Sequence, residues 1–281
     1  MFKFILLIVF FLAVLFAGLV TLLPNQNAYG SKNPVAEIGK EIKNPLPNVH
    51  TIAPEISNAL ESVKLPVALT TKAGPALDER ALSDHSGAVF SNKDIPDANF
   101  SGSTLKSAKF DGALLDGSIF EGAHGDGAIF AGARMAKANF SASHLPAADF
   151  SGAELREASA RGAHLAKALF VDADISFASF SGGALASADF RKAYAAGAIF
   201  VDANMKGARL AGADLTGARF ERANLSSATF EAADLTLANF AGARLHGADL
   251  SGAVNLTQEQ LNAACADAET KAPAGLVAPR C

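Results

Sequence analysis

The chain has 281 residues, half of them hydrophobic, with 24 Lys+Arg against 28 Asp+Glu and a net charge of −4. This is enough for one large domain or two small ones, and the chain is too apolar to be disordered and too evenly charged to bind nucleic acid through a basic field. Two cysteines, Cys265 and Cys281, exclude a framework of several disulfides and a Cys-rich zinc site.

The first predicted element is an uncharged apolar segment, residues 4–23 (FILLIVFFLAVLFAGLVTLL). As a helix it would be about 30 Å long, the thickness of the hydrocarbon core of a bilayer. Residues 1–30 are therefore either a retained membrane anchor or a signal peptide cleaved after Ala28-Tyr29-Gly30. The anchor is favoured because 20 apolar residues exceed the usual core of a signal peptide.

Lysines flank this segment on both sides, so their distribution does not decide its orientation. A short N-terminus with Lys3, a long apolar segment and a polar body are typical of an exported protein. We expect the bacterial inner membrane with the body in the periplasm, or the periplasm itself if the signal is cleaved.

Residues 31–85 form a Pro-rich linker, because six prolines interrupt any helix. One short amphipathic helix remains, with Ile56, Leu60 and Val63 at helical spacing. The linker is either a solvated spacer whose helix caps the next domain, or a segment that docks on a membrane partner.

From residue 86 the sequence repeats every five residues without an insertion. Alanine occupies 29 of the 34 positions 88, 93 and onward to 253. The positions 90, 95 and onward to 250 are large and apolar, except Gly125, Ala160 and Ala195. Neither a helix nor a strand alternation has this period, which instead indicates a solenoid.

Units such as Ala148-Asp149-Phe150 and Ala248-Asp249-Leu250 resemble the pentapeptide-repeat family, and the chain is similar to its exported or membrane-anchored bacterial members. The resemblance implies an all-β solenoid over residues 86–255, a right-handed quadrilateral β-helix with four pentapeptides in each coil. At 20 residues a coil, the repeat makes about eight coils.

The sequence supports a 20-residue coil on its own. Phenylalanine occupies 14 of the 17 positions 90, 100 and onward to 250, and none of the positions between them. Two opposite walls would then carry stacked Phe that fill the lumen. The predicted lumen residues include Phe110, Phe130, Phe150, Phe170 and Phe190.

Opposite charges also recur 20 residues apart, which places them one above another. The predicted pairs are Lys106/Asp126, Arg134/Glu154, Lys137/Glu157, Asp172/Lys192, Asp189/Arg209 and Asp202/Arg222. Glu154/Asp174 and Asp214/Asp234 are like-charge exceptions. Each exposed pair contributes only about 0–1 kcal/mol, so these pairs mainly support the register.

Residues 256–281 are a predicted cap and tail. Thr257 and Gln260 have the spacing of a capping box, and Leu261 would face the last coil. This short helix either caps the rod or pairs two rods, which leaves the oligomeric state open. Cys265 and Cys281 flank the tail and would form a disulfide in an exported protein, or stay free thiols in the cytosol.

The best candidate for chemistry is a column of three histidines, His124, His144 and His164, which are 20 residues apart. They are weak metal candidates, because a linear column does not converge as zinc ligands do. A pH-sensitive stripe and a solvent-facing His copied by duplication are the alternatives. The sequence has no nucleophile elbow, phosphate loop or HExxH, and a filled lumen leaves no pocket. We therefore expect no enzyme activity and no cofactor.

Outward apolar residues are the candidates for contact with a protein. Phe177 and Leu237 share a column with two glycines between them, Ile129 and Leu169 share another, and Tyr194 also points outward. A contiguous patch would mark an interface, whereas scattered apolar residues are ordinary on protein surfaces.

The favoured function is a non-enzymatic membrane-tethered scaffold or protein-interaction module, for example a subunit of a larger membrane complex. One alternative is a soluble periplasmic binding module after signal cleavage. The family resemblance adds another, a DNA-mimicking gyrase-interacting protein. The repeat departs from that pattern, with 15 basic and 18 acidic residues and columns of opposite charge. Nucleic acid is disfavoured as a partner.

Overall fold

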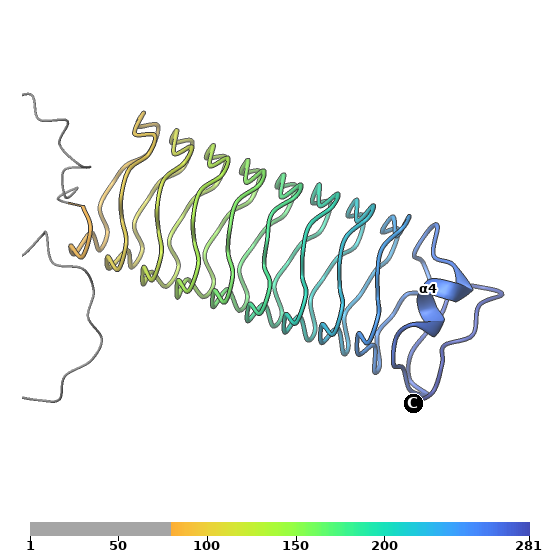
Figure 1. Ribbon diagram of the computed structural model, residues 1–281. Helices are drawn as coiled ribbons and strands as arrows, with labels where there is room; N and C mark the ends of the chain where they lie inside the picture. The colour runs from red at the N-terminus through yellow and green to blue at the C-terminus, as the bar shows by residue number, and fades with distance from the viewer. Residues whose placement is uncertain (1–79) are drawn as a thin grey trace, which may run out of the picture. The chain divides into compact units, whose positions relative to one another are not determined.

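The computed structural model describes residues 80–281 (Figure 1). The predicted membrane or signal segment and the predicted helix at Ile56–Val63 lie outside this part. Within residues 80–281, no helix is both long and apolar enough to cross a bilayer.

The repeat forms a solenoid whose coils stack along one axis (Figure 1). One residue of every five makes a parallel β-bridge to the residue 20 positions later, from Asp84 with Thr104 to Asp234 with Val254. Four bridge columns define four walls, which agrees with the predicted coil of 20 residues. The bridges are one residue long because a corner follows each of them, so the repeat has no extended strands. The solenoid begins before residue 86, since Asp84 already bridges the next coil.

A tight turn makes each corner. The Ala113 N–H donates to the Phe110 carbonyl at 3.0 Å, closing a four-residue turn in which Gly112 has a φ of 63°. This left-handed conformation favours glycine. Side chains accept it at many corners, including Phe177 at 59° and Leu237 at 55°. The alanine after the turn is buried in every coil except at the two ends, at Ala88 and Ala253, because the corner leaves little room for a larger side chain.

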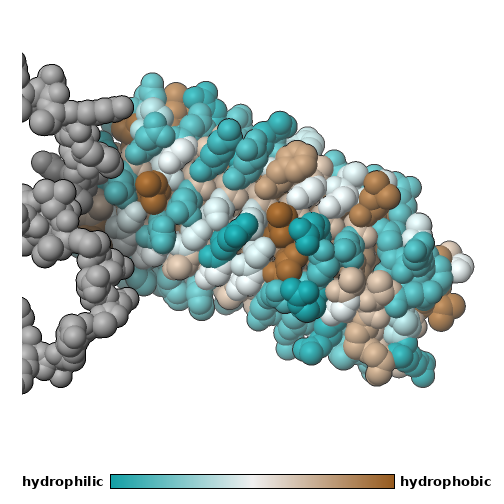
Figure 2. Space-filling view, viewed as in Figure 1, coloured by the Kyte–Doolittle hydropathy of each residue, from teal (hydrophilic) through white to brown (hydrophobic). Residues whose placement is uncertain are grey.

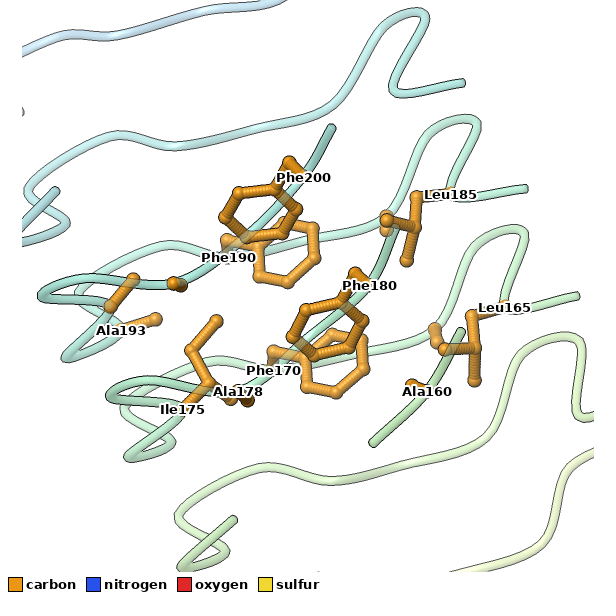
Figure 3. Packing of buried hydrophobic residues seen from close by; sticks show 14 of the residues in the cluster. Ala160, Leu165, Phe170, Ile175, Ala178, Phe180, Leu185, Phe190, Ala193 and Phe200 are labelled. Atoms are coloured by element: carbon orange, nitrogen blue, oxygen red, sulfur yellow. The ribbon is translucent and has the colours of Figure 1, made fainter. Parts of the chain in front are cut away.

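Two ladders of phenylalanine fill the lumen (Figure 3). Rings 20 residues apart stack, as Phe170 and Phe190 do with centroids 4.8 Å apart. Rings 10 residues apart meet edge to face across the lumen, as Phe170 and Phe180 do at 5.5 Å. Both arrangements suit the quadrupole of the ring and add about 0.5–1.5 kcal/mol a pair to the effect of burial. All the predicted lumen phenylalanines are buried: Phe110, Phe130, Phe150, Phe170 and Phe190.

The exceptions to the repeat are packed differently from one another. Ala160 replaces a ring, and beside it lies an apolar cavity of about 10 Å³, enough for one water molecule. Gly125 is crowded, since a Cβ there would lie 2.8 Å from the Leu105 Cβ and 3.0 Å from a Leu145 methyl. The leucines before and after Gly125 thus occupy the space of the absent side chain.

A short helix covers the last coil, as the sequence predicts. Helix α4 (Gln258–Asn262) begins after Thr257, whose hydroxyl accepts the Gln260 N–H, and the Gln260 side chain accepts the Thr257 N–H. The Gln260 amide also donates to the carbonyls of Leu235 and Ala238, both at 2.8 Å. Leu261 is fully buried. The helix therefore satisfies backbone groups at the open edge of the solenoid.

Three of the predicted ion pairs form: Lys137–Glu157, Arg209–Asp189 and Arg222–Asp202. Arg134 differs from the prediction, because it pairs at 2.7 Å with Asp116 instead of Glu154. Asp116 lies at a corner one coil earlier, where its other oxygen accepts the Ala136 N–H. A carboxylate held in this way is a better partner than a freely rotating Glu.

Candidate protein-interaction surface

The filled lumen directs the search to the outside of the rod. Within the described repeat, the buried phenylalanines, leucines and alanines occupy the lumen, with a small cavity beside Ala160. Three side chains of each five-residue unit point outward. Two of them are at the corner, and the third is at the bridge position in the middle of the wall. Figure 2 shows that apolar side chains on the visible face are separated by polar ones.

The most prominent apolar feature is a corner column, the 177–237 ridge, made of Phe177, Gly197, Gly217 and Leu237. Phe177 is 65% exposed and Leu237 is 80% exposed. A Cβ at Gly197 would lie 2.7 Å from two ring carbons of Phe177, so the Phe177 ring lies over Gly197. No atom lies within 4 Å of the Cβ position at Gly217. The ridge thus has an apolar side chain at each end and a shallow gap between them.

Tyr194 extends this apolar surface onto the adjoining wall. It is 59% exposed and bridges Asp174 and Asp214 in the neighbouring coils. Ile199, half-buried, lies on the wall at the other side of the same corner. Asp174 is paired with Arg156, so the charge beside Tyr194 is partly neutralised. Tyr194 therefore lies on the wall that leads into the corner of the ridge, one coil after Phe177.

Ile129 and Leu169 lie on a different wall and do not join the ridge. Ile129 is half-buried, Leu169 is 38% exposed, and Asp149 stands between them in the bridge column. At the corner next to this wall is an open depression of about 320 Å³. Its lining residues are Val171, Arg191, Lys192, Ala211, Gly212, Glu231 and Ala232. This depression was not predicted, although small residues at this corner, such as Ala211, Gly212 and Ala232, are visible in the five-residue register.

The histidine column forms as predicted, with exposed rings. The centroids of His124 and His144 are 6.0 Å apart, and those of His144 and His164 are 5.3 Å apart, with the rings tilted. The three rings follow the axis of the rod and do not converge on one point. Their role as a metal site stays a weak candidate.

The cysteines are joined in a Cys265–Cys281 disulfide, with Cα atoms 5.5 Å apart. The tail therefore returns to the chain just after α4. His246 lies beside the disulfide, with its Nε2 3.4 Å from the Cys265 Sγ. This histidine is not evident from sequence, because it lies 19 residues before Cys265 and 35 before Cys281, and only the stacking of the coils brings it close.

Arginines balance the most buried carboxylate on the rod. Burial raises the pKa of Asp189, but hydrogen bonds from Arg191 and the nearby Arg209 and Arg191 charges outweigh burial and hold that pKa below its usual range. The Arg191 and Arg209 guanidinium groups lie 2.8 and 3.2 Å from the Asp189 carboxylate. Because such pairs neutralise the acidic groups, the rod does not present a continuous acidic stripe at this wall.

Comparison with known proteins identifies the repeat. The family described as pentapeptide repeats matches in eight copies, over residues 86–122, 108–146, 148–183, 185–222 and 218–254. These matches cover more than half of the chain and support the right-handed sense expected for the solenoid. Among curated proteins, none matches the sequence.

Solved structures similar to the chain are also pentapeptide-repeat or resistance proteins. Full-length QnrB1, a plasmid-mediated fluoroquinolone resistance protein, is 19% identical over 66% of this chain and 94% of its own, with a TM-score of 0.44. HetL, involved in heterocyst differentiation regulation in Nostoc sp. strain PCC 7120, is 26% identical over 69% and 92%, with a TM-score of 0.27. A protein of the Arabidopsis thaliana thylakoid lumen is 25% identical over 55% and 77%, with a TM-score of 0.20.

Proposed function

This chain belongs to the pentapeptide-repeat family, and we propose that it is a non-enzymatic protein-interaction module, tethered to the inner membrane by residues 4–23 with its rod in the periplasm. One observation carries the proposal. The core is occupied by stacked rings and alanines along the whole repeat, so the rod can act only through its outer walls and corners.

The 177–237 ridge is the surface we assign to the partner. Large apolar side chains are unusual at left-handed corner positions, where glycine is less strained, yet Phe177 and Leu237 both occupy such positions and are exposed. Neither side chain supports the lumen. The partner we propose is a protein that covers the two side chains and the gap over Gly217 between them.

Two features support the tether and the compartment. The apolar segment 4–23 is long enough to span a bilayer and has no charge. The Cys265–Cys281 disulfide suits an oxidising compartment, since such bonds are rare in the cytosol. A subunit of a larger membrane complex is the form of the proposal that uses the tether and the ridge together.

The DNA-mimic alternative has less support. Carboxylates on the rod are engaged by arginines, as Asp202 is by Arg222 at 2.7 Å. A DNA mimic needs unpaired acidic groups at regular spacing, because it imitates phosphates that are not neutralised by neighbours. Failure of the purified protein to inhibit gyrase supercoiling is the result expected.

The test uses the full chain in its own membranes. The protein is solubilised gently, sized and analysed by mass spectrometry, in parallel with the double variant Phe177→Ser and Leu237→Ser. We expect residues 4–23 to be present and a reproducible larger assembly that the double variant loses.

The matched control is Leu82→Ser. Leu82 is also a leucine at a left-handed corner, with a φ of 56° and 84% exposure, but on another corner column. It should leave the assembly intact. A soluble species that starts at Ser31 and has no partner would contradict the tether. Equal loss of the assembly with Leu82→Ser would contradict the assignment of the ridge.

A further inference from the structure

The C-terminal end of the rod brings together three side chains that can bind a soft metal ion. The Nε2 atom of His246 lies 3.4 Å from the Cys265 Sγ and 4.0 Å from the Cys281 Sγ. All three atoms lie within 4.8 Å of one another. His246 and Cys265 are half-buried and Cys281 is exposed, so a small ion can reach them from solvent.

These distances are close to those between ligands of a tetrahedral zinc ion. Bond lengths of about 2.3 Å to sulfur and 2.0–2.1 Å to nitrogen place the sulfur and nitrogen ligands about 3.6 Å apart and two sulfurs about 3.8 Å apart. The nitrogen is already near this distance from both sulfurs. Only the sulfurs must separate, and side-chain rotation can do this with the Cα atoms 5.5 Å apart.

The backbone holds the three ligands in place without the disulfide. Cys265 belongs to the coil, since its N–H donates to the Ala243 carbonyl and its carbonyl accepts the Leu245 N–H, at 2.8 and 2.7 Å. His246 directly follows Leu245 in the chain, so the same contacts position it. These contacts fix His246 and Cys265 in neighbouring coils.

The tail that carries Cys281 is held by separate contacts. Gln258 donates to the Val277 carbonyl and accepts the Val277 N–H, at 2.8 and 2.9 Å. The Ala266 N–H donates to the Pro279 carbonyl at 3.1 Å. Reduction of the disulfide therefore leaves Cys281 beside Cys265 and His246.

We infer that His246, Cys265 and Cys281 form a Cys2His site for a thiophilic divalent ion such as Zn²⁺, which is closed by the disulfide and opened by reduction. Three protein ligands leave the fourth position to water, as in open zinc sites. The site is separate from the ridge and from the histidine column.

The chemistry balances with an external dithiol as the reductant. The dithiol gives two electrons and two protons to the Cys265–Cys281 bond, which breaks into two thiols, and the dithiol becomes a disulfide. Binding of the ion then displaces both thiol protons, and the neutral imidazole of His246 supplies the nitrogen. Metal binding consequently protects the reduced form from reoxidation.

The test compares Zn²⁺ binding by the oxidised and reduced full chain, measured by competition with a chromophoric chelator. The reduced protein should bind one ion, at least about 100-fold tighter than the oxidised protein. His246→Ala should weaken binding by the reduced protein by at least about 10–100-fold, because loss of a ligand costs no less than loss of an outer contact. With Co²⁺, the reduced protein should show thiolate charge-transfer absorption and the intense visible bands of a tetrahedral ion.

His164→Ala is the matched control, since it removes an exposed histidine from the rod and should leave the affinity unchanged. Circular dichroism of each reduced variant checks that the solenoid is folded. Equal affinity of the oxidised and reduced protein would overturn the inference. So would unchanged binding in His246→Ala, or loss of binding in His164→Ala, which would place the ion on the histidine column.

Discussion

Two serines at the buried alanine position of the five-residue repeat should respond to the same substitution with opposite signs. Ser118 and Ser143 are both fully buried. The Ser118 hydroxyl accepts the Ala98 N–H at 3.1 Å and donates to the Ile95 carbonyl at 3.4 Å, so it bridges two backbone groups of a corner. The Ser143 hydroxyl has no hydrogen-bond partner among the described residues.

The difference arises in the neighbouring corner. Beside Ser143, the Ala123 N–H already donates to the Phe120 carbonyl at 3.0 Å, so the corner offers no free N–H to this hydroxyl. An unpaired buried hydroxyl costs about 1–3 kcal/mol, and Ser143→Ala should raise the free energy of unfolding by about that amount. Ser118→Ala should lower it by a similar amount, because the Ala98 N–H loses its acceptor.

Thermal unfolding of the purified full chain, followed by circular dichroism, measures both effects. For a domain of this size, about 1 kcal/mol corresponds to about 2–4 °C in the midpoint. We expect the midpoint to rise in Ser143→Ala and to fall in Ser118→Ala. A fall in both variants, or a rise in both, would refute the assignment of the two hydroxyls.

Three further predictions concern the rest of the rod. Phe120 stacks between Phe100 and Phe140 at 5.1 and 4.7 Å. Phe120→Ala should lower the free energy of unfolding by about 3–5 kcal/mol and Phe120→Leu by less, because leucine refills part of the volume of the ring; equal losses in urea unfolding would contradict this volume-filling role. Gly125→Ala should lower stability by about 1–3 kcal/mol, since its Cβ would lie 2.8 Å from the Leu105 Cβ, whereas Gly132→Ala has open space for its Cβ and should lose only the cost of its left-handed φ. Burial raises the pKa of both Asp174 and Asp189, but hydrogen bonds and arginine charges bring each pKa below its usual range. The stability that these two carboxylates contribute is present above the unfolded pKa of about 3.9 and is lost as pH falls through the lower folded pKa values. The melting midpoint should therefore be level from about pH 7 to 5 and drop below about pH 4. A drop already near pH 6 would contradict the assignment to these two carboxylates.

The architecture of the rod could be predicted from sequence because a strict period needs no knowledge of distant contacts. With a period of five and Phe every ten residues, each position has one direction, inward or outward, in every coil. The stacking of Phe170 on Phe190 and the exposure of Phe177 follow from that register. Helix α4 was also predictable, because the Thr257–Gln260 capping box is a local interaction.

The site could be predicted only in part. The outward direction of Phe177, Tyr194 and Leu237 and the separate column of Ile129 and Leu169 were clear from the register, but the depression at the corner next to that column was not. The predicted pairing of Arg134 with Glu154 was wrong for a related reason. An outward side chain lies within reach of residues 18 and 20 positions away, and the choice between them depends on rotamers and on hydrogen bonds already made by the acceptor.

The sequence by itself determined which residues form the core and which face solvent, since the repeat imposes a periodic direction on every side chain. Only the tertiary structure decided which outward groups meet. Ser118 bridges a corner and Ser143 does not, although both occupy the same repeat position, because the corners beside them differ in their hydrogen bonds. His246 reaches Cys265 because stacking of the last coil places residues about 20 positions apart side by side. Such contacts between coils depend on local geometry that the period does not encode.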